Sequence, residues 1–281
     1  MKILIVLTYY RPHISGLTIY AERLAKAFAA RGHAVTVLTS QFKKDLPREE
    51  VQDDVKIVRV PVLFRLSKGV IMPAFGFTAN RLVSWADVIQ LHLPQFDAAG
   101  ISLRGRLLRK PTIITYHCDL HMPPGLFNRF ANLAVTFMNR LTAIFTHRIV
   151  TYTQDYAENS PYLKRYLKKL KVIPPPVVLP QVTKEAVANF AKQYNPQDRH
   201  PVIGMATRFA TEKGVEVLIK ALPEVIRVFP NTLVQFVGTY QQVIGKEKYF
   251  ARLKPEIDRF QASGHWKFLG ELDPEKMAMY F

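Results

Sequence analysis

The sequence predicts an α/β protein with two halves, each a parallel sheet covered by helices. Residues 2–39 show a strand–helix–strand pattern, which is the unit from which parallel sheets are built. Prolines at residues 174–176 and 180 then interrupt the chain, because consecutive prolines continue neither a helix nor a central strand. A new strand–loop–helix pattern begins at Val202. We therefore expect a domain at residues 1–175 and another at residues 176–281, close to the usual size of about 150 residues.

The first half opens with a buried strand at residues 2–7. Gly16 precedes a helix whose apolar residues recur every three or four positions, and Gly32 ends it before a strand at residues 34–39. Further short strands are expected at residues 56–60, 87–91, 112–116 and 148–152.

A long helix is expected at residues 126–146. Its apolar residues, among them Phe130, Leu133, Phe137 and Ile144, repeat at helical intervals with arginines alongside. Such a helix can lie in a membrane interface, although an apolar stripe of this kind more often faces the core.

The second half continues after the prolines with a helix at residues 184–194. Strands follow at residues 202–207, 233–237 and 266–269, separated by a helix at 214–229 and another ending near residue 262. Asp273 and Pro274 then have the N-cap and first-turn positions of one more helix. Because a doubly wound domain normally has five or six strands, the second domain is expected to be incomplete at its C-terminal end.

The charge is strongly positive and uneven. Of the formal +17, residues 1–180 hold 25 basic and 11 acidic residues (25 − 11 = +14), against 14 and 11 in residues 181–281 (+3). Without a zinc-finger, basic-zipper or RNP-like sequence, nucleic acid is not expected as a partner. An anionic membrane surface fits diffuse positive charge better, and a solvated basic face is the alternative.

Other features bear on location. The single cysteine, Cys118, excludes an internal disulfide and a cysteine-cluster zinc site. No apolar run reaches the roughly eighteen residues of a membrane span, and the start lacks a secretory pattern. The expected location is cytoplasmic, with possible peripheral attachment at the inner face of the membrane.

The loop at residues 208–214 carries the most specific signal. It follows a strand, precedes a helix, and holds Arg208 and Lys213 five positions apart. Helix N-termini attract anions, and Arg and Lys are the usual phosphate-binding side chains. The loop is thus suited to a diphosphate, although two solvated surface charges would look the same.

Four segments together resemble the retaining GT-B glycosyltransferases of family 4. They are residues 12–16 with the following helix to Arg31-Gly32-His33, residues 91–94, residues 115–120, and residues 208–214. The likeness spans the whole chain, but Ser15-Gly16 replaces the usual glycine pair. It implies GT-B architecture, with two Rossmann-like domains facing a cleft. It also implies metal-independent transfer, with retention, from a nucleotide-diphosphate sugar to a hydroxyl of a lipid-linked or surface glycan, without a cofactor.

The resemblance also assigns residues in the second domain and the first loop. Arg208 and Lys213 would bind the diphosphate and stabilise the leaving group, so they count as catalytic. Gly16 and Gly238 would let the backbone approach the nucleotide sugar, although Gly16 could instead only permit a turn.

In the first domain the resemblance assigns a histidine and its neighbours. His117, after a strand end, would contact the sugar or the reacting centre. His92 and Asp119 would lie on the acceptor side. Both histidines could instead be structural, and Asp119 could cap a helix.

One expected motif is missing. Family members have two glutamates eight positions apart in the second domain; Glu216 and Glu224 have that spacing, but they lie too early in the fold. The alternative function is therefore an inactive fragment or a nucleotide-sugar-binding module. A dinucleotide-dependent oxidoreductase is disfavoured, because no Gly-x-Gly-x-x-Gly follows the first strand.

Overall fold

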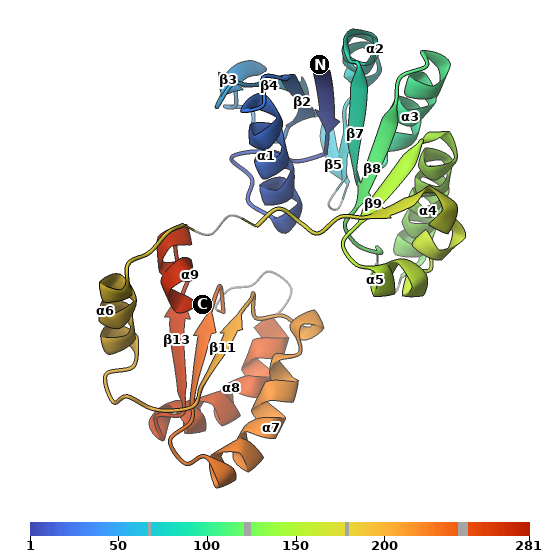
Figure 1. Ribbon diagram of the computed structural model, residues 1–281. Coiled ribbons are helices and arrows are strands. Elements are labelled where there is room, and N and C mark those ends of the chain that lie inside the picture. Colours follow the sequence, from blue (N-terminus) through green and yellow to red (C-terminus); the bar gives the residue numbers. More distant parts are fainter. Residues whose placement is uncertain (67–68, 121–124, 178–179, 241–246) are drawn as a thin grey trace. The chain divides into compact units, whose positions relative to one another are not determined.

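The computed structural model describes residues 1–66, 69–120, 125–177, 180–240 and 247–281, without the side chains of Leu66, Phe127 and Asn128. These residues form two compact units, Met1–Pro176 and Val177–Phe281, each described here by itself (Figure 1). The division falls one residue from the predicted boundary. Around the boundary, residues 173–177 with the expected prolines have no regular structure, and residues 178–179 lie outside the described part.

The first unit is built on an eight-stranded sheet with the order β10-β9-β8-β7-β1-β2-β4-β3. Its strands are β1 (Lys2–Val6), β2 (Ala34–Gln41), β3 (Glu49–Gln52), β4 (Val55–Pro61), β7 (Val88–Leu93), β8 (Thr112–Tyr116), β9 (Arg148–Thr151) and β10 (Leu170–Val172). Every neighbouring pair is parallel except β3 with β4. A separate antiparallel pair joins β5 (Phe64–Leu66) to β6 (Gly69–Ile71). The parallel sheet predicted from the opening pattern is confirmed.

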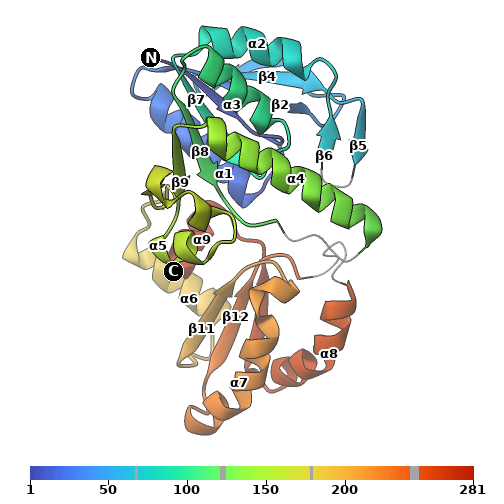
Figure 2. The ribbon, with the colours of Figure 1, turned by 90° about the vertical axis from the view of Figure 1, so that its right-hand side faces the viewer.

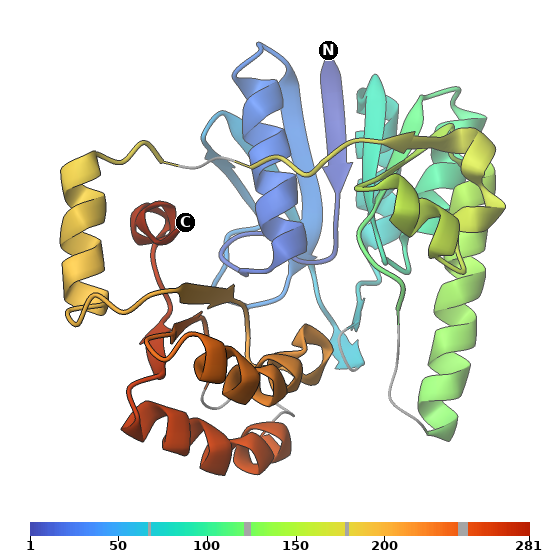
Figure 3. The ribbon, with the colours of Figure 1, turned by 60° about the horizontal axis from the view of Figure 1, so that its bottom comes forward.

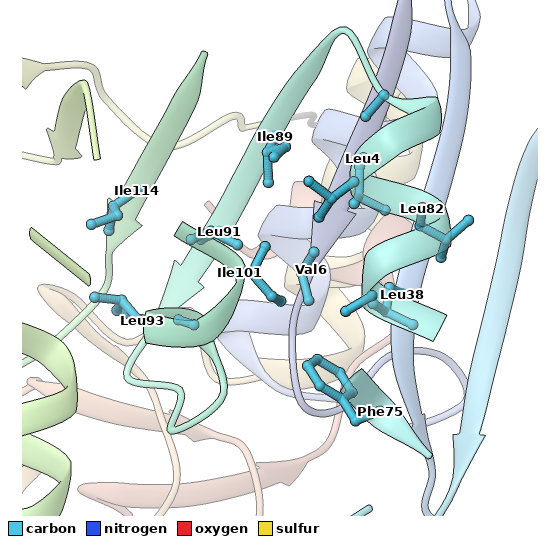
Figure 4. Close-up of a cluster of buried hydrophobic side chains, with 14 of the residues drawn as sticks. Leu4, Val6, Leu38, Phe75, Leu82, Ile89, Leu91, Leu93, Ile101 and Ile114 are labelled. Carbon is cyan, nitrogen blue, oxygen red and sulfur yellow. The ribbon is translucent and has the colours of Figure 1, made fainter. Parts of the chain in front are cut away.

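Helices cover both faces of this sheet (Figures 1 and 3). α1 (Gly16–Ala29) packs on one face through Ala21 and Ala25. α2 (Phe75–Trp85) and α3 (Ala98–Leu107) cover the other face, where their side chains interleave with buried strand residues (Figure 4). The remaining helices are α4 (Leu126–Phe145), α5 (Gln154–Asn159) and the short η1 (Leu163–Arg165) and η2 (Leu167–Lys169).

The orientation of α4 contradicts the commoner expectation for its apolar stripe. Phe130, Leu133 and Phe137 are all exposed, whereas the residues that face inward are Asn139 and Thr142, together with Ala143. The core-facing interpretation of the stripe is therefore wrong, since its large apolar side chains point to solvent.

The second unit has a three-stranded parallel sheet with the order β11-β12-β13. Its elements are α6 (Lys184–Tyr194), β11 (Val202–Ala206), η3 (Thr211–Lys213), α7 (Val215–Val228), β12 (Leu233–Val237), α8 (Glu247–Ala262), β13 (Trp266–Gly270) and α9 (Pro274–Tyr280). α7 and α8 pack on one face around buried Phe236. On the other side α6 and α9 lie together, and the Tyr280 hydroxyl donates to the Gln235 carbonyl (2.8 Å). The predicted N-cap is confirmed, because Asp273 accepts a hydrogen bond from the backbone N–H of Lys276 (2.8 Å).

Candidate functional site

Two histidines meet at the carboxyl ends of β7 and β8. His92 lies in β7, and His117 directly follows β8, so their parallel strands bring the rings to one edge of the sheet. His92 Nδ1 and His117 Nε2 are 2.9 Å apart, within hydrogen-bonding distance. The other nitrogen of His117, Nδ1, is hydrogen-bonded to the hydroxyl of Tyr152, which follows β9. Both ring nitrogens of His117 are thus engaged by protein groups.

The donor and acceptor in each of these hydrogen bonds can be assigned from the burial of His92. His92 is fully buried, and its Nε2 has no hydrogen-bond partner among the described residues. A buried donor without an acceptor is rarer than a buried acceptor without a donor, so we place the proton of His92 on Nδ1. His92 then donates to His117, and His117 Nδ1–H donates to the oxygen of Tyr152. The hydroxyl hydrogen of Tyr152 is left to donate elsewhere.

Burial keeps both imidazoles neutral. Loss of hydration lowers the pKa of His117 to about 4. The pKa of His92 is held well below its ordinary value by burial first and by the neighbouring His117 second. At neutral pH the pair therefore acts as hydrogen-bonding groups and carries no positive charge.

Tyr20 of α1 completes this cluster from the other side. Its ring lies edge-on to His117, with centroids 5.2 Å apart, and it also contacts His92 and Tyr152. Gly16 lies one helical turn before Tyr20 and on the same face of α1. A Cβ on Gly16 would meet no atom within 4 Å, so no turn or close packing among the described residues requires glycine there. The space above the first turn of α1 is open.

Asp119 is near His117 in sequence, but its carboxylate is used by other groups. It accepts hydrogen bonds from the hydroxyls of Tyr116 (3.0 Å), Tyr156 (2.9 Å) and Ser160 (2.9 Å). Its backbone N–H also donates to the Tyr156 hydroxyl (2.7 Å). Asp119 thus ties the end of β8 to α5 and the segment after it.

The second candidate site is the loop between β11 and α7. Phe209, between the two cations in sequence, is fully buried against Phe236 and Tyr249. The backbone N–H of Phe209 also donates to the Thr239 carbonyl (2.9 Å). The core of the second unit therefore fixes Phe209 and Ala210, while Arg208, Lys213 and the residues between Ala210 and Lys213 are exposed.

Arg208 and Lys213 are both exposed. Arg208 forms a long, exposed ion pair with Glu212 (3.8 Å), which contributes little and is weakened by salt. Gly214 adopts a left-handed conformation (φ 69°) at the start of α7. In the first turn, the N–H of Glu216 donates to the Tyr249 hydroxyl (3.3 Å) and the N–H of Val217 to the Gly214 carbonyl (2.9 Å). Two exposed cations beside the positive end of a helix are features that suit an anion.

Gly238 lies against the backbone that leads into this loop. Its φ of 123° suits glycine alone, and a Cβ there would lie 2.2 Å from the Thr207 carbonyl oxygen. Glycine at this position is thus required by the backbone that holds Arg208, whatever binds there.

Neither a metal-binding cluster nor a membrane-spanning helix is found among the described residues. No three His, Cys, Asp or Glu side chains come together in a way that could hold a metal ion. No described helix is both long and apolar enough to cross a membrane.

Comparison with known proteins decides the family. Residues 14–180 match Glycosyltransferase Family 4, and residues 187–281 match Glycosyl transferases group 1. The chain belongs to glycosyltransferase family 4. The resemblance inferred from the four sequence segments is thereby confirmed.

Relatives of this family 4 chain match all or most of it at low identity. It is 24% identical to the alpha-monoglucosyldiacylglycerol synthase of Acholeplasma laidlawii, covering 100% of the chain and 72% of that protein. It is 26% identical to an uncharacterized glycosyltransferase of Methanocaldococcus jannaschii, over 80% of the chain and 60% of that protein. Among solved structures, Anabaena HepE in complex with UDP has a TM-score of 0.72 at 19% identity, covering 100% of the chain and 71% of HepE. The predicted GT-B fold class is confirmed.

Three residues of these candidate sites were not predicted from the sequence. Tyr152 follows a strand end just as His117 does, so the same rule would have found it. Tyr20 lies four positions after Gly16 on a helix, a spacing that puts both on one face. Phe209, inside the cationic loop, gave no signal of being buried.

Proposed function

We propose that this chain transfers a sugar from a nucleotide-diphosphate sugar to an acceptor hydroxyl, with retention at the anomeric carbon. The observation that carries the proposal is the loop of residues 208–214, where a buried phenylalanine fixes two exposed cations at the start of α7. Such an arrangement suits a diphosphate, which is the part shared by all nucleotide-sugar donors.

In this proposal Arg208 and Lys213 bind the diphosphate. As the bond to the sugar breaks, negative charge grows on the leaving phosphate, and both side chains stabilise it without a metal ion or cofactor. α7 begins directly after these residues, so the positive end of its dipole adds to the attraction for the same anion. Gly238 keeps the loop in place.

The first unit supplies neutral polar groups at its strand ends. His117 orients the Tyr152 hydroxyl, and we assign this pair to the sugar or the reacting centre. His92 is buried, so it acts through His117 and does not reach the acceptor directly. Gly16 leaves open space for part of the nucleotide sugar or its acceptor.

The acceptor class we propose is a lipid-linked or surface glycan. Support comes from the excess of basic residues in the first 180 positions and from the Acholeplasma relative, whose name describes the synthesis of a glucosylated diacylglycerol. A chain acting on such acceptors would work at the cytoplasmic face of a membrane.

The test is transfer and hydrolysis of UDP-glucose, the sugar donor present in a further HepE structure. Arg208→Ala and Lys213→Ala should each lower kcat/KM by about 100-fold or more, as loss of one transition-state contact does. Lys220→Ala and Arg227→Ala remove exposed charges from the body of α7 and serve as matched controls. Full activity in both loop variants would refute the site.

The same assay separates catalysis from binding alone. UDP binding without turnover of several nucleotide sugars would favour the nucleotide-sugar-binding module. The anomeric configuration of the product, read by NMR, tests retention, and an unchanged rate after chelation of divalent metals tests metal independence.

A further inference from the structure

α4 has an exposed apolar side that needs a partner. Five large side chains form what we call the α4 stripe: Leu126 (78% exposed), Phe130 (71%), Leu133 (68%), Phe137 (54%) and Ile144 (56%). At about 100° per residue, these five positions fall within an arc of about 60°. Arg129 and Arg140 lie along one border of that arc. The apolar surface is therefore continuous along the helix and not a scatter of single residues.

Contacts on the opposite side of α4 fix the orientation in which the stripe faces outward. Asn139 and Thr142 are buried, and the Asn139 carbonyl accepts a hydrogen bond from the Tyr162 hydroxyl (2.7 Å). From residue 125 to residue 138, none of the described side chains of α4 is buried. Figures 2 and 3 show this helix at the surface of the first unit, beside α3. The first unit packs the C-terminal part of α4 by its polar side and leaves the α4 stripe uncovered.

The charge around the α4 stripe is predominantly positive. Residues 98–154 contain seven basic residues and one acidic residue, Asp119; two more acidic residues, Asp155 and Glu158, follow in α5. The basic residues are Arg104, Arg106, Arg109, Lys110, Arg129, Arg140 and Arg148. The Asp119 carboxylate is occupied by three hydroxyl groups. No carboxylate of α4 itself offsets its arginines.

More positive charge lies at the C-terminal end of α4. Residues 160–176 contain five basic and no acidic residues. One of them, Lys169, donates to the carbonyls of Ala143 (2.8 Å) and Ile144 (2.9 Å), which places this basic segment against the end of the α4 stripe. Arg140 and Arg165 both lie close to Tyr166.

We propose that the α4 stripe docks on the surface of a bilayer that contains anionic lipid. Apolar side chains on one side of a helix lie at the boundary between headgroups and acyl chains, and bordering arginines extend to the phosphates. Diffuse positive charge is rewarded by an anionic surface. A second copy of this chain fits less well, because two such surfaces would bring like charges together. The inference rests on the part of the proposed function that puts the chain at a membrane.

The experiment measures binding of the full chain to vesicles of phosphatidylcholine, with and without phosphatidylglycerol, at low and high salt. Phe130→Ser/Phe137→Ser should weaken binding to the anionic vesicles by at least about tenfold, since each phenylalanine loses apolar burial. Arg129→Gln/Arg140→Gln should weaken it by about tenfold at low salt and by less at high salt.

The matched control is Val51→Ser/Phe77→Ser, which removes two apolar side chains of similar exposure (72% and 84%) from elsewhere in the first unit. It should bind within about twofold of the parent chain, because neither residue belongs to the stripe. All altered side chains are exposed, so circular dichroism should show each variant folded.

Three results would overturn the proposal: no binding of the parent chain to anionic vesicles, equal binding by the α4 variants, or a lipid-free dimer that Phe130→Ser/Phe137→Ser dissociates. UDP binding, measured on the same samples, keeps the two proposals apart. Vesicle binding with no UDP binding would support membrane docking of the α4 stripe and count against glycosyl transfer. UDP binding and turnover with no vesicle binding would support glycosyl transfer and refute membrane docking.

Discussion

Two glycines assigned to the nucleotide sugar should respond in opposite ways to the same added methyl group. At Gly238 the methyl would meet the Thr207 carbonyl oxygen at 2.2 Å, in a backbone conformation (φ 123°) that L-residues rarely adopt. Strain of this kind costs about 1–3 kcal/mol, and the displaced carbonyl adds to it, so Gly238→Ala should lower the free energy of unfolding by about 3 kcal/mol or more. At Gly16 the methyl meets nothing within 4 Å. Gly16→Ala should leave stability unchanged or raise it by about 0.5 kcal/mol.

Calorimetry and measurements of UDP-glucose binding test both glycine variants. A loss of 1 kcal/mol moves the Tm of a domain of this size by about 4–8 °C, so the second unit of Gly238→Ala should melt at least about 10 °C lower. Gly16→Ala should melt normally but bind UDP-glucose about tenfold more weakly, if a ligand fills the space above α1. Unchanged melting of Gly238→Ala would refute the steric argument. Normal UDP-glucose binding and turnover by Gly16→Ala would remove Gly16 from the site.

Three further predictions concern the first unit. Burial holds the pKa of His117 at about 4 in the folded chain, whereas a histidine in the unfolded chain has a pKa of about 6.5. As the pH falls, the unfolded chain therefore takes up this proton first, and unfolding becomes more favourable. His117 should therefore contribute a drop of about 2–3 kcal/mol in unfolding free energy between pH 7.5 and 4.5 in urea titrations, in addition to that of His92, and His117→Asn should lose the His117 contribution. Asp119→Asn puts an amide where three hydroxyls donate, and should cost about 2–3 kcal/mol in the same titrations while UDP binding is kept. Tyr152→Phe should stay folded by circular dichroism yet lose about tenfold or more in kcat/KM, and full activity would exclude its hydroxyl from the reaction.

The longer strands of the parallel sheets were predictable because each is a short apolar run, whereas β3, β5, β6 and β10 were not predicted. β8, β12 and α6 occur at the residues expected, and β7 and β9 differ by one or two positions. α3 gave no periodic signal, since Gly100, Ser102 and Gly105 weaken its helical propensity. Its packing explains why it forms: Gly105 leaves room for the Thr112 hydroxyl, which would lie 2.4 Å from an added Cβ. Contacts between distant residues, which periodicity does not show, stabilise this helix.

The candidate site residues came from two kinds of reasoning. The resemblance to family 4 assigned His117, which follows a strand end, and the strand–loop–helix pattern suggested Arg208 and Lys213; their roles stay predictions. Which side of α4 would face the core was not predictable, because periodicity reveals a one-sided helix but not the direction of that side. The buried Asn139 and Thr142 decide it, and their partners come from elsewhere in the chain.

Phe209 makes the cationic loop inseparable from the interior of the second unit. Its ring contacts Phe236, Tyr249 and Phe250, so the backbone between Arg208 and Lys213 is part of the hydrophobic core. A loop anchored in this way holds its two charges ready before any ligand arrives, and it has little freedom to adapt. Heat or denaturant should therefore abolish phosphate binding in the same cooperative step that melts this core, with no earlier stage in which the loop alone has failed.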